Sequence, residues 1–170
     1  MFDNNYETLH DRIDIRAVSP ITEKEYQVGG TTALLDAIGR TIHKIANVQR
    51  NTAEDYRAQK VMFVIITDGE ENSSREYTVQ MVKSLIEQQK TKHAWEFIFL
   101  GANIDAVLTA GRLGITSDRA IDYLADSEGT ELNFKVMTNV AATFRKTGNV
   151  NEACLEEIRE DVRRRGARSR

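Results

Sequence analysis

The sequence is poor in several residue types, and each shortage argues against a class of protein. Cys154 is the only cysteine in 170 residues, so no disulfide can form within the chain, and a reducing compartment such as the cytoplasm is favoured. No apolar run reaches the roughly 18 residues needed to cross a bilayer. The first ten residues lack the basic and apolar regions of a signal peptide. We therefore expect a cytoplasmic protein with no membrane partner.

The chain also lacks a large excess of charge of either sign, with 23 basic and 26 acidic residues. The net charge is −3, so no overall field attracts nucleic acid. Residues 159–170 are the exception, because six arginines against two acids give this segment a net charge of +4. We expect this short basic tail to be solvated and frayed. Contact of the tail with nucleic acid or with an acidic partner is the weaker alternative.

What the chain does contain is an alternation of strand and helix patterns, and a hydrophobic content of 41% that suits one compact core. Buried strands are predicted at 61–67, 95–105 and 120–126. Amphipathic helices are predicted at 32–48, 75–91 and 106–115, then up to Gly148, and again from Asn151. This alternation is typical of an α/β fold with an open, mostly parallel, Rossmann-like sheet flanked by helices.

The first residues carry a different pattern. Residues 6–17 end with Ile13 and Ile15 at a period of two, which predicts a half-buried strand. The turn-forming sequence DNN at 3–5 predicts a hairpin whose first arm consists of Met1 and Phe2. We therefore expect an N-terminal strand remnant or hairpin ahead of the sheet.

One acidic residue, Asp68, directly follows the buried strand predicted at 61–67. Ligands of open α/β sheets bind beyond the carboxyl ends of the strands, so Asp68 is a candidate site residue. Thr31 offers a hydroxyl from an upstream loop introduced by Gly29 and Gly30. Mg²⁺ prefers oxygen ligands and retains several waters, so one carboxylate and a threonine hydroxyl suit it chemically. Gly69, with the two upstream glycines, would shape the loops around such an ion.

A purely structural interpretation of the same residues also stands. Asp-Gly after a strand is a common turn, and Thr31 or Thr32 can cap the helix predicted at 32–48. Glu70 and Glu71 are expected to be solvated loop acids.

Three segments together carry a family resemblance: GGTTALLDAIGRTI (29–42), VMFVIITDGEENSS (61–74) and WEFIFLGANID (95–105). In order, spacing and context they resemble a von Willebrand factor type A (vWA) domain of the bacterial, intracellular type. The resemblance covers about residues 2–146 and implies a vWA-like domain over 1–148, followed by a charged helix and basic tail over 149–170. It also implies that Thr31 and Asp68 are two pieces of a metal-ion-dependent adhesion site, which binds Mg²⁺ or Mn²⁺.

The chain departs from that family at its beginning. The family's principal metal motif, Asp-x-Ser-x-Ser, follows its first strand, and no such motif precedes Thr31 here. Without that strand, the strand at 61–67 would present an unpaired apolar edge. Three explanations remain open: the chain begins upstream of Met1, a partner or second copy supplies the strand, or the chain is a degenerate fragment. We expect weak or no specific metal binding by this chain alone.

Motifs of catalysis are missing from the sequence. There is no phosphate-binding loop, no dinucleotide fingerprint and no nucleophile elbow. His10, His43 and His93 follow no metal-ligand spacing. The resemblance implies a non-enzymatic module that binds an acidic residue of a protein partner through Mg²⁺. A metal-dependent hydrolase or phosphotransferase on the same sheet, or a metal-free fragment, are the alternatives.

Overall fold

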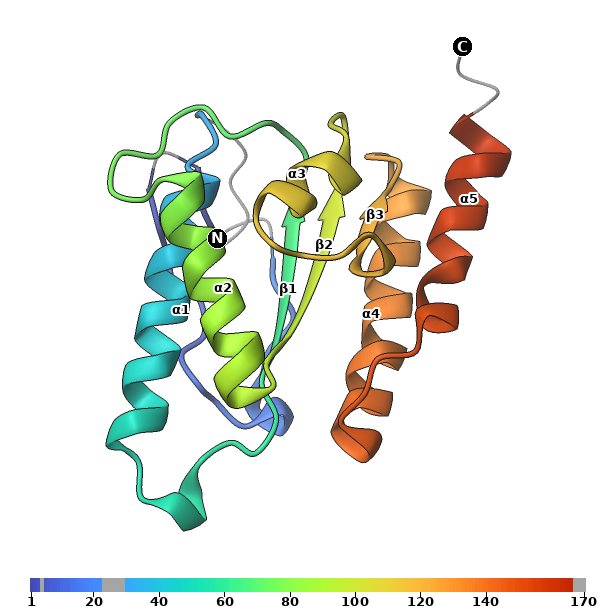
Figure 1. The fold of residues 1–170 in the computed structure, drawn as a ribbon. Helices are drawn as coiled ribbons and strands as arrows, with labels where there is room; N and C mark the ends of the chain where they lie inside the picture. Colours follow the sequence, from blue (N-terminus) through green and yellow to red (C-terminus); the bar gives the residue numbers. More distant parts are fainter. Residues whose placement is uncertain (4, 23–29, 167–170) are drawn as a thin grey trace.

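A computed structural model of the chain describes residues 1–3, 5–22 and 30–166. Its centre is an open parallel sheet of three strands, β1 (Met62–Thr67), β2 (Glu96–Gly101) and β3 (Ala120–Asp122), in the order β1-β2-β3 (Figure 1). Met62 is level with Glu96 at one end of the β1–β2 pair, and Thr67 is level with Gly101 at the other. The predicted α/β class and the three predicted strands are confirmed.

Five α-helices of the described chain flank the sheet: α1 (Leu34–Asn51), α2 (Val79–His93), α3 (Ala106–Arg112), α4 (Ser127–Thr147) and α5 (Glu156–Gly166). Short 3-10 helices occur at η1 (Ile15–Ala17), η2 (Glu54–Tyr56), η3 (Ser117–Arg119) and η4 (Glu152–Leu155). Helices α1 and α2 lie side by side on one side of the sheet, whereas α4 and α5 lie on the other (Figure 1).

The sheet divides the core in two, because successive strand residues point to opposite faces. Phe97 and Phe99 of β2 pack with residues of α1, α2 and α3. Ile98 and Leu100 pack with residues of α4 and α5. All four side chains are at most 2% exposed, as expected for a strand with a neighbour on each side. Strand β1 is less covered, and four of its six residues are only half-buried.

Helix α4 shows how local sequence sets the helix ends. Asp126 caps its first turn by accepting the backbone N–H of Gly129 at 2.7 Å. Gly129 packs so closely on the carbonyl of Leu124 that no side chain would fit there. Gly148 ends the helix in the left-handed region, with φ of 77°.

The N-terminal prediction is confirmed in part. Met1 and Glu7 exchange backbone hydrogen bonds of 2.7 and 2.9 Å around an antiparallel bridge between Phe2 and Tyr6, so a short hairpin forms. The strand predicted over 6–17 is wrong. Asp14 accepts the backbone N–H of Arg16 at 2.9 Å, which favours a 3-10 turn over an extended backbone.

The C-terminal prediction of a frayed tail is wrong for residues 159–166, which belong to α5. Leu155 and Ile158, just before them, are at most 1% exposed and pack against α4 and the sheet. Residues 167–170 lie outside the described part of the chain.

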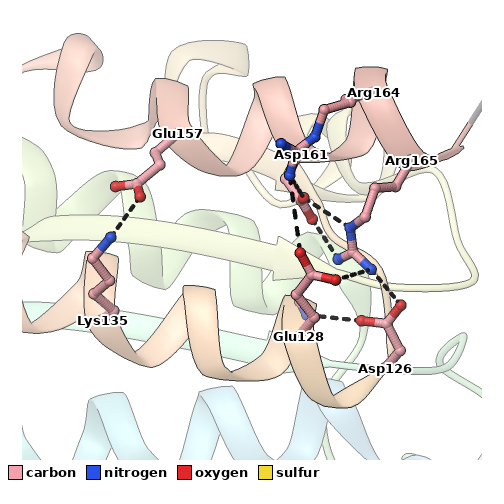
Figure 2. Close-up of polar contacts among 8 residues, drawn as sticks. Asp126, Glu128, Lys135, Glu157, Asp161, Arg164 and Arg165 are labelled. Carbon is pink, nitrogen blue, oxygen red and sulfur yellow. Dashed lines mark hydrogen bonds and ion pairs between the residues drawn. The ribbon is translucent and has the colours of Figure 1, made fainter.

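A cluster of charged side chains holds the end of α5 (Figure 2). Arg165 binds Asp161 of the same helix at 2.5 and 2.8 Å and reaches Asp126, the cap of α4, at 2.6 Å. The Arg165 guanidinium lowers the pKa of the buried Asp161 carboxyl, and burial opposes this without outweighing it. The basic segment is therefore bound to acids of its own chain.

No helix within the described residues combines the length and the apolar composition that crossing a bilayer requires.

Candidate binding site at the carboxyl edge of the sheet

Three loops meet where β1 and β2 end, and hydrogen bonds tie them together. Thr32, in the loop before α1, donates its N–H to the side chain of Asn72 at 2.8 Å and accepts the N–H of Asn72 at 3.1 Å. The loop after β2 is joined through Asn103, whose Nδ2 donates to the carbonyl of Asp68 at 3.3 Å. The segments containing the predicted site residues are therefore brought to one edge of the molecule.

Glu71 fixes the loop after β1 to the start of α1. Its carboxylate accepts the N–H of Leu35 at 2.8 Å, the N–H groups of Ser73 and Ser74 at 3.0 and 2.7 Å, and the Ser74 hydroxyl at 2.7 Å. A carboxylate is favourable at a helix N-terminus because the first N–H groups have no partner within the helix. The expectation that Glu71 is a solvated acid is therefore wrong.

The predicted capping of α1 by threonine is also wrong. The N-cap position is occupied by Ala33, which makes no side-chain cap bond. The cap comes instead from Glu71, 36 residues further along the chain. A motif search confined to neighbouring residues could not find it.

Asp36 makes the reciprocal connection from α1 to the loop. Its side chain, which is buried with 7% of the residue exposed, accepts the N–H groups of Arg75, Glu76 and Tyr77, each at 2.9 Å. Burial alone would raise the pKa of Asp36, but the three backbone N–H groups outweigh it and hold the pKa below its usual 3.8. The sequence did carry a signal of this role, because Asp36 is the one charged residue in the otherwise uncharged run ALLDAIG at 33–39.

The predicted metal ligands lie at this edge. Asp68 and Thr31 are both exposed. Within the described part of the chain the Asp68 carboxylate has no hydrogen-bond or ion-pair partner.

The predicted loop-shaping glycines lie there too, where they can be described. Thr32 Oγ1 is 3.3 Å from the point that a Cβ on Gly69 would occupy, so the two loops approach closely there. Gly30 has a φ of 82°, which favours glycine. Gly29 lies outside the described residues.

The acids at the ends of β2 and β3 are used differently from Asp68. Asp105 caps α3 by accepting the N–H of Leu108 at 2.8 Å. Asp122 accepts the N–H of Ala106 at 2.9 Å. Both carboxylates therefore hold α3 in place, whereas the Asp68 carboxylate faces solvent.

The oxygen donors at this edge are of the type that Mg²⁺ prefers, but they are few. Asp68 and the hydroxyls of Thr31 and Thr32 are hard oxygen donors of the type Mg²⁺ prefers. Among the described residues, however, no three His, Cys, Asp or Glu side chains gather closely enough to hold a metal ion. An ion bound here would depend on few protein ligands and retain most of its water.

Comparison of the chain with protein-family models, with curated proteins and with solved structures gives no match in any of the three.

Proposed function

We propose that this protein is a non-enzymatic protein-binding module that uses the carboxyl edge of its sheet to capture an acidic group of a partner protein. The observation that supports this most directly is the state of Asp68. Its carboxylate is exposed and unengaged among the described residues, whereas Glu71, Asp105 and Asp122 around it are committed to backbone N–H groups. The edge is therefore held together by hydrogen bonds, and neither Asp68 nor the exposed Glu70 contributes its carboxylate to them among the described residues. Of these two acids, Asp68 is the one that directly follows β1.

Thr31 and Asp68 are the residues we propose to hold a Mg²⁺ ion, directly or through water. The bound ion would supply positive charge and open coordination positions for a carboxylate of the partner. Asp36 and Glu71 hold the loop after β1 to the start of α1 without any ion. The vWA resemblance motivates this mode of recognition, and the small ligand set implies that the chain alone binds the ion weakly.

Calorimetric titration with Mg²⁺ and Mn²⁺ tests the metal site. We expect dissociation constants weaker than about 0.1 mM for the chain alone, because few protein ligands replace the ion's water. Asp68→Ala is expected to abolish this binding. Glu70→Ala removes an exposed acid two residues away and is the matched control. Micromolar binding that is lost in Asp68→Ala would contradict the expectation that the chain alone binds the ion weakly. Equal binding by wild type and Asp68→Ala would show that Asp68 is not a ligand of the ion.

A second titration tests partner capture, with a synthetic peptide that carries one exposed glutamate as the probe. We expect the peptide to bind in the presence of Mg²⁺, and not in the presence of EDTA or to Asp68→Ala. A version of the peptide with glutamine in place of glutamate is the control on the ligand side. Binding that is indifferent to Mg²⁺ would refute capture through the ion.

A further inference from the structure

The outer edge of β1 has no strand beside it in the described structure. The carbonyls of Val61 and Thr67 accept the N–H groups of Glu96 and Ala102 of the β2 segment at 3.0 and 2.9 Å. Odd-numbered residues of β1 therefore point their backbone groups toward β2. By the period of two, Met62, Val64 and Ile66 point theirs the other way. No backbone hydrogen bond between described residues reaches these groups.

A groove of about 470 Å³ runs along this edge. One wall is β1 itself from Phe63 to Ile66, and another is the N-terminal segment, including residues 6–12. The third wall is α1, through the apolar Ala37, Ile38 and Ile45 together with Thr41 and Lys44. The groove therefore combines unpaired backbone groups of β1 with a mainly apolar wall. An added β-strand would form hydrogen bonds with the backbone groups and would cover the apolar side chains.

The sequence of β1 is consistent with a neighbour on this side. Its uninterrupted apolar run is typical of a strand flanked by others and covered on both faces. Yet Phe63, Val64 and Ile66 are only half-buried, whereas Ile98, Phe99 and Leu100 of β2 are fully buried. An unpaired apolar edge of this kind readily accepts a strand from another chain.

The same chain exposes a segment with a strand pattern. Ile13, Ile15, Val18 and Ile21 are 43, 66, 43 and 54% exposed, an unusual run of large apolar side chains at the surface. Ile13 and Ile15 alternate with Asp14 and Arg16, the pattern of a strand that buries one face.

We propose that the segment around Ile13 and Ile15 of a second copy of this chain enters the groove and pairs with β1. One face of the added strand would lie against the apolar wall of α1 and receive the two isoleucines. The opposite face, on the side of Met62 and Val64, would carry Asp14 and Arg16. The short turn at Ile15–Ala17 opens in the process.

The occupant is a second copy rather than the chain's own segment, because residues 6–12 of the same chain already form a wall of the groove. Arg12 lies in that wall, so the chain's own Ile13 would have to displace its immediate neighbours to enter. Two copies that exchange this segment satisfy both grooves at once and close a two-fold dimer. This contact is separate from the carboxyl edge, so it extends the proposed function and does not rest on it.

Sedimentation velocity of the full chain over a range of about 5 to 500 µM tests the proposal. We expect a monomer–dimer equilibrium that Ile13→Lys/Ile15→Lys weakens by roughly tenfold or more, because two apolar side chains would no longer be buried. Both positions are exposed in the monomer, so the variant keeps its fold, which circular dichroism verifies. Val107→Lys/Leu108→Lys is the matched control, because these α3 side chains are 43 and 53% exposed and do not line the groove. A monomer at every concentration, or a dimer unaffected by Ile13→Lys/Ile15→Lys, would overturn the proposal.

Hydrogen exchange locates the contact. We expect the amides of Met62, Val64 and Ile66 to become protected as concentration rises. Val64→Pro removes one outward N–H, which an edge strand tolerates, and is expected to weaken the dimer without unfolding the monomer. Protection of these amides that does not change with concentration would show an occupant from the same chain and would refute exchange between copies.

Discussion

Replacement of Asp36 by alanine tests the central connection of the candidate site. The Asp36 carboxylate accepts three backbone N–H groups at 2.9 Å each and is 7% exposed. A buried N–H left without a partner costs about 1–3 kcal/mol, and a loop can relax to admit water. We therefore expect Asp36→Ala to lower the free energy of unfolding by about 3 kcal/mol.

The conservative change Asp36→Asn keeps the size and shape of the side chain and alters only its hydrogen bonding, so it separates these two contributions to stability. Oδ1 accepts the N–H groups of Glu76 and Tyr77, and Oδ2 accepts that of Arg75. An asparagine keeps one acceptor oxygen and turns its amide toward the remaining N–H, so at least one bond is lost. A destabilisation of about 1–2 kcal/mol is expected, between wild type and alanine.

Urea unfolding followed by circular dichroism measures both variants. Asp55→Ala, in the exposed helix η2, removes an acid without such bonds and should change stability by no more than about 0.5 kcal/mol. A loss below about 1 kcal/mol in Asp36→Ala would refute the argument that these bonds hold the loop to α1.

The pH dependence carries a sign that can be checked. The pKa of Asp36 is lower in the folded chain than its usual 3.8, because the backbone N–H groups favour the charged form. The unfolded chain therefore binds this proton first as pH falls, and the stabilisation is complete above about pH 4 to 5 and declines below it. Wild type should lose this part of its stability on acidification, whereas Asp36→Ala should lack it. Parallel curves of stability against pH for the two proteins would contradict the assignment.

Two further predictions concern α4 and α5. Arg165→Ala leaves the buried Asp161 without its main partner and should cost about 3 kcal/mol in urea unfolding, whereas Lys135→Ala breaks an exposed ion pair worth at most about 1 kcal/mol. Both interactions are drawn in Figure 2, and equal losses would show that the bonds of Arg165 to Asp161 and Asp126 add no more stability than the exposed pair. Gly129→Ala places a Cβ against a backbone carbonyl and should lower the thermal midpoint, whereas Gly111→Ala has open space and should raise stability by up to about 1 kcal/mol. A tolerated Gly129→Ala would mean that the turn before α4 yields more easily than its packing indicates.

The N-terminal segment shows where pattern alone fails. Ile13 and Ile15 have the spacing of a strand, yet within the described structure no neighbouring strand pairs with them. A strand gains its hydrogen bonds only from another strand, so the same pattern without a partner gives way to a local turn around Asp14.

The prediction for the basic C-terminal segment fails for a related reason. Composition predicts a solvated tail, but Asp126 and Asp161 are placed where Arg165 can bind both. Asp126 is 39 residues away in the chain, so their proximity depends on how α4 and α5 pack together.

By itself the sequence determined the three strands of the sheet, the helices that flank it and the position of Asp68 at the carboxyl end of β1. These features depend on apolar periodicity and on neighbouring residues, which are local properties. Only the tertiary structure decided that Glu71 caps α1, that Asp36 holds the loop from the other side, and that Asp68 remains exposed between them. Those roles depend on hydrogen bonds between residues 36 to 41 positions apart, and such partners meet only after the sheet and helices have packed.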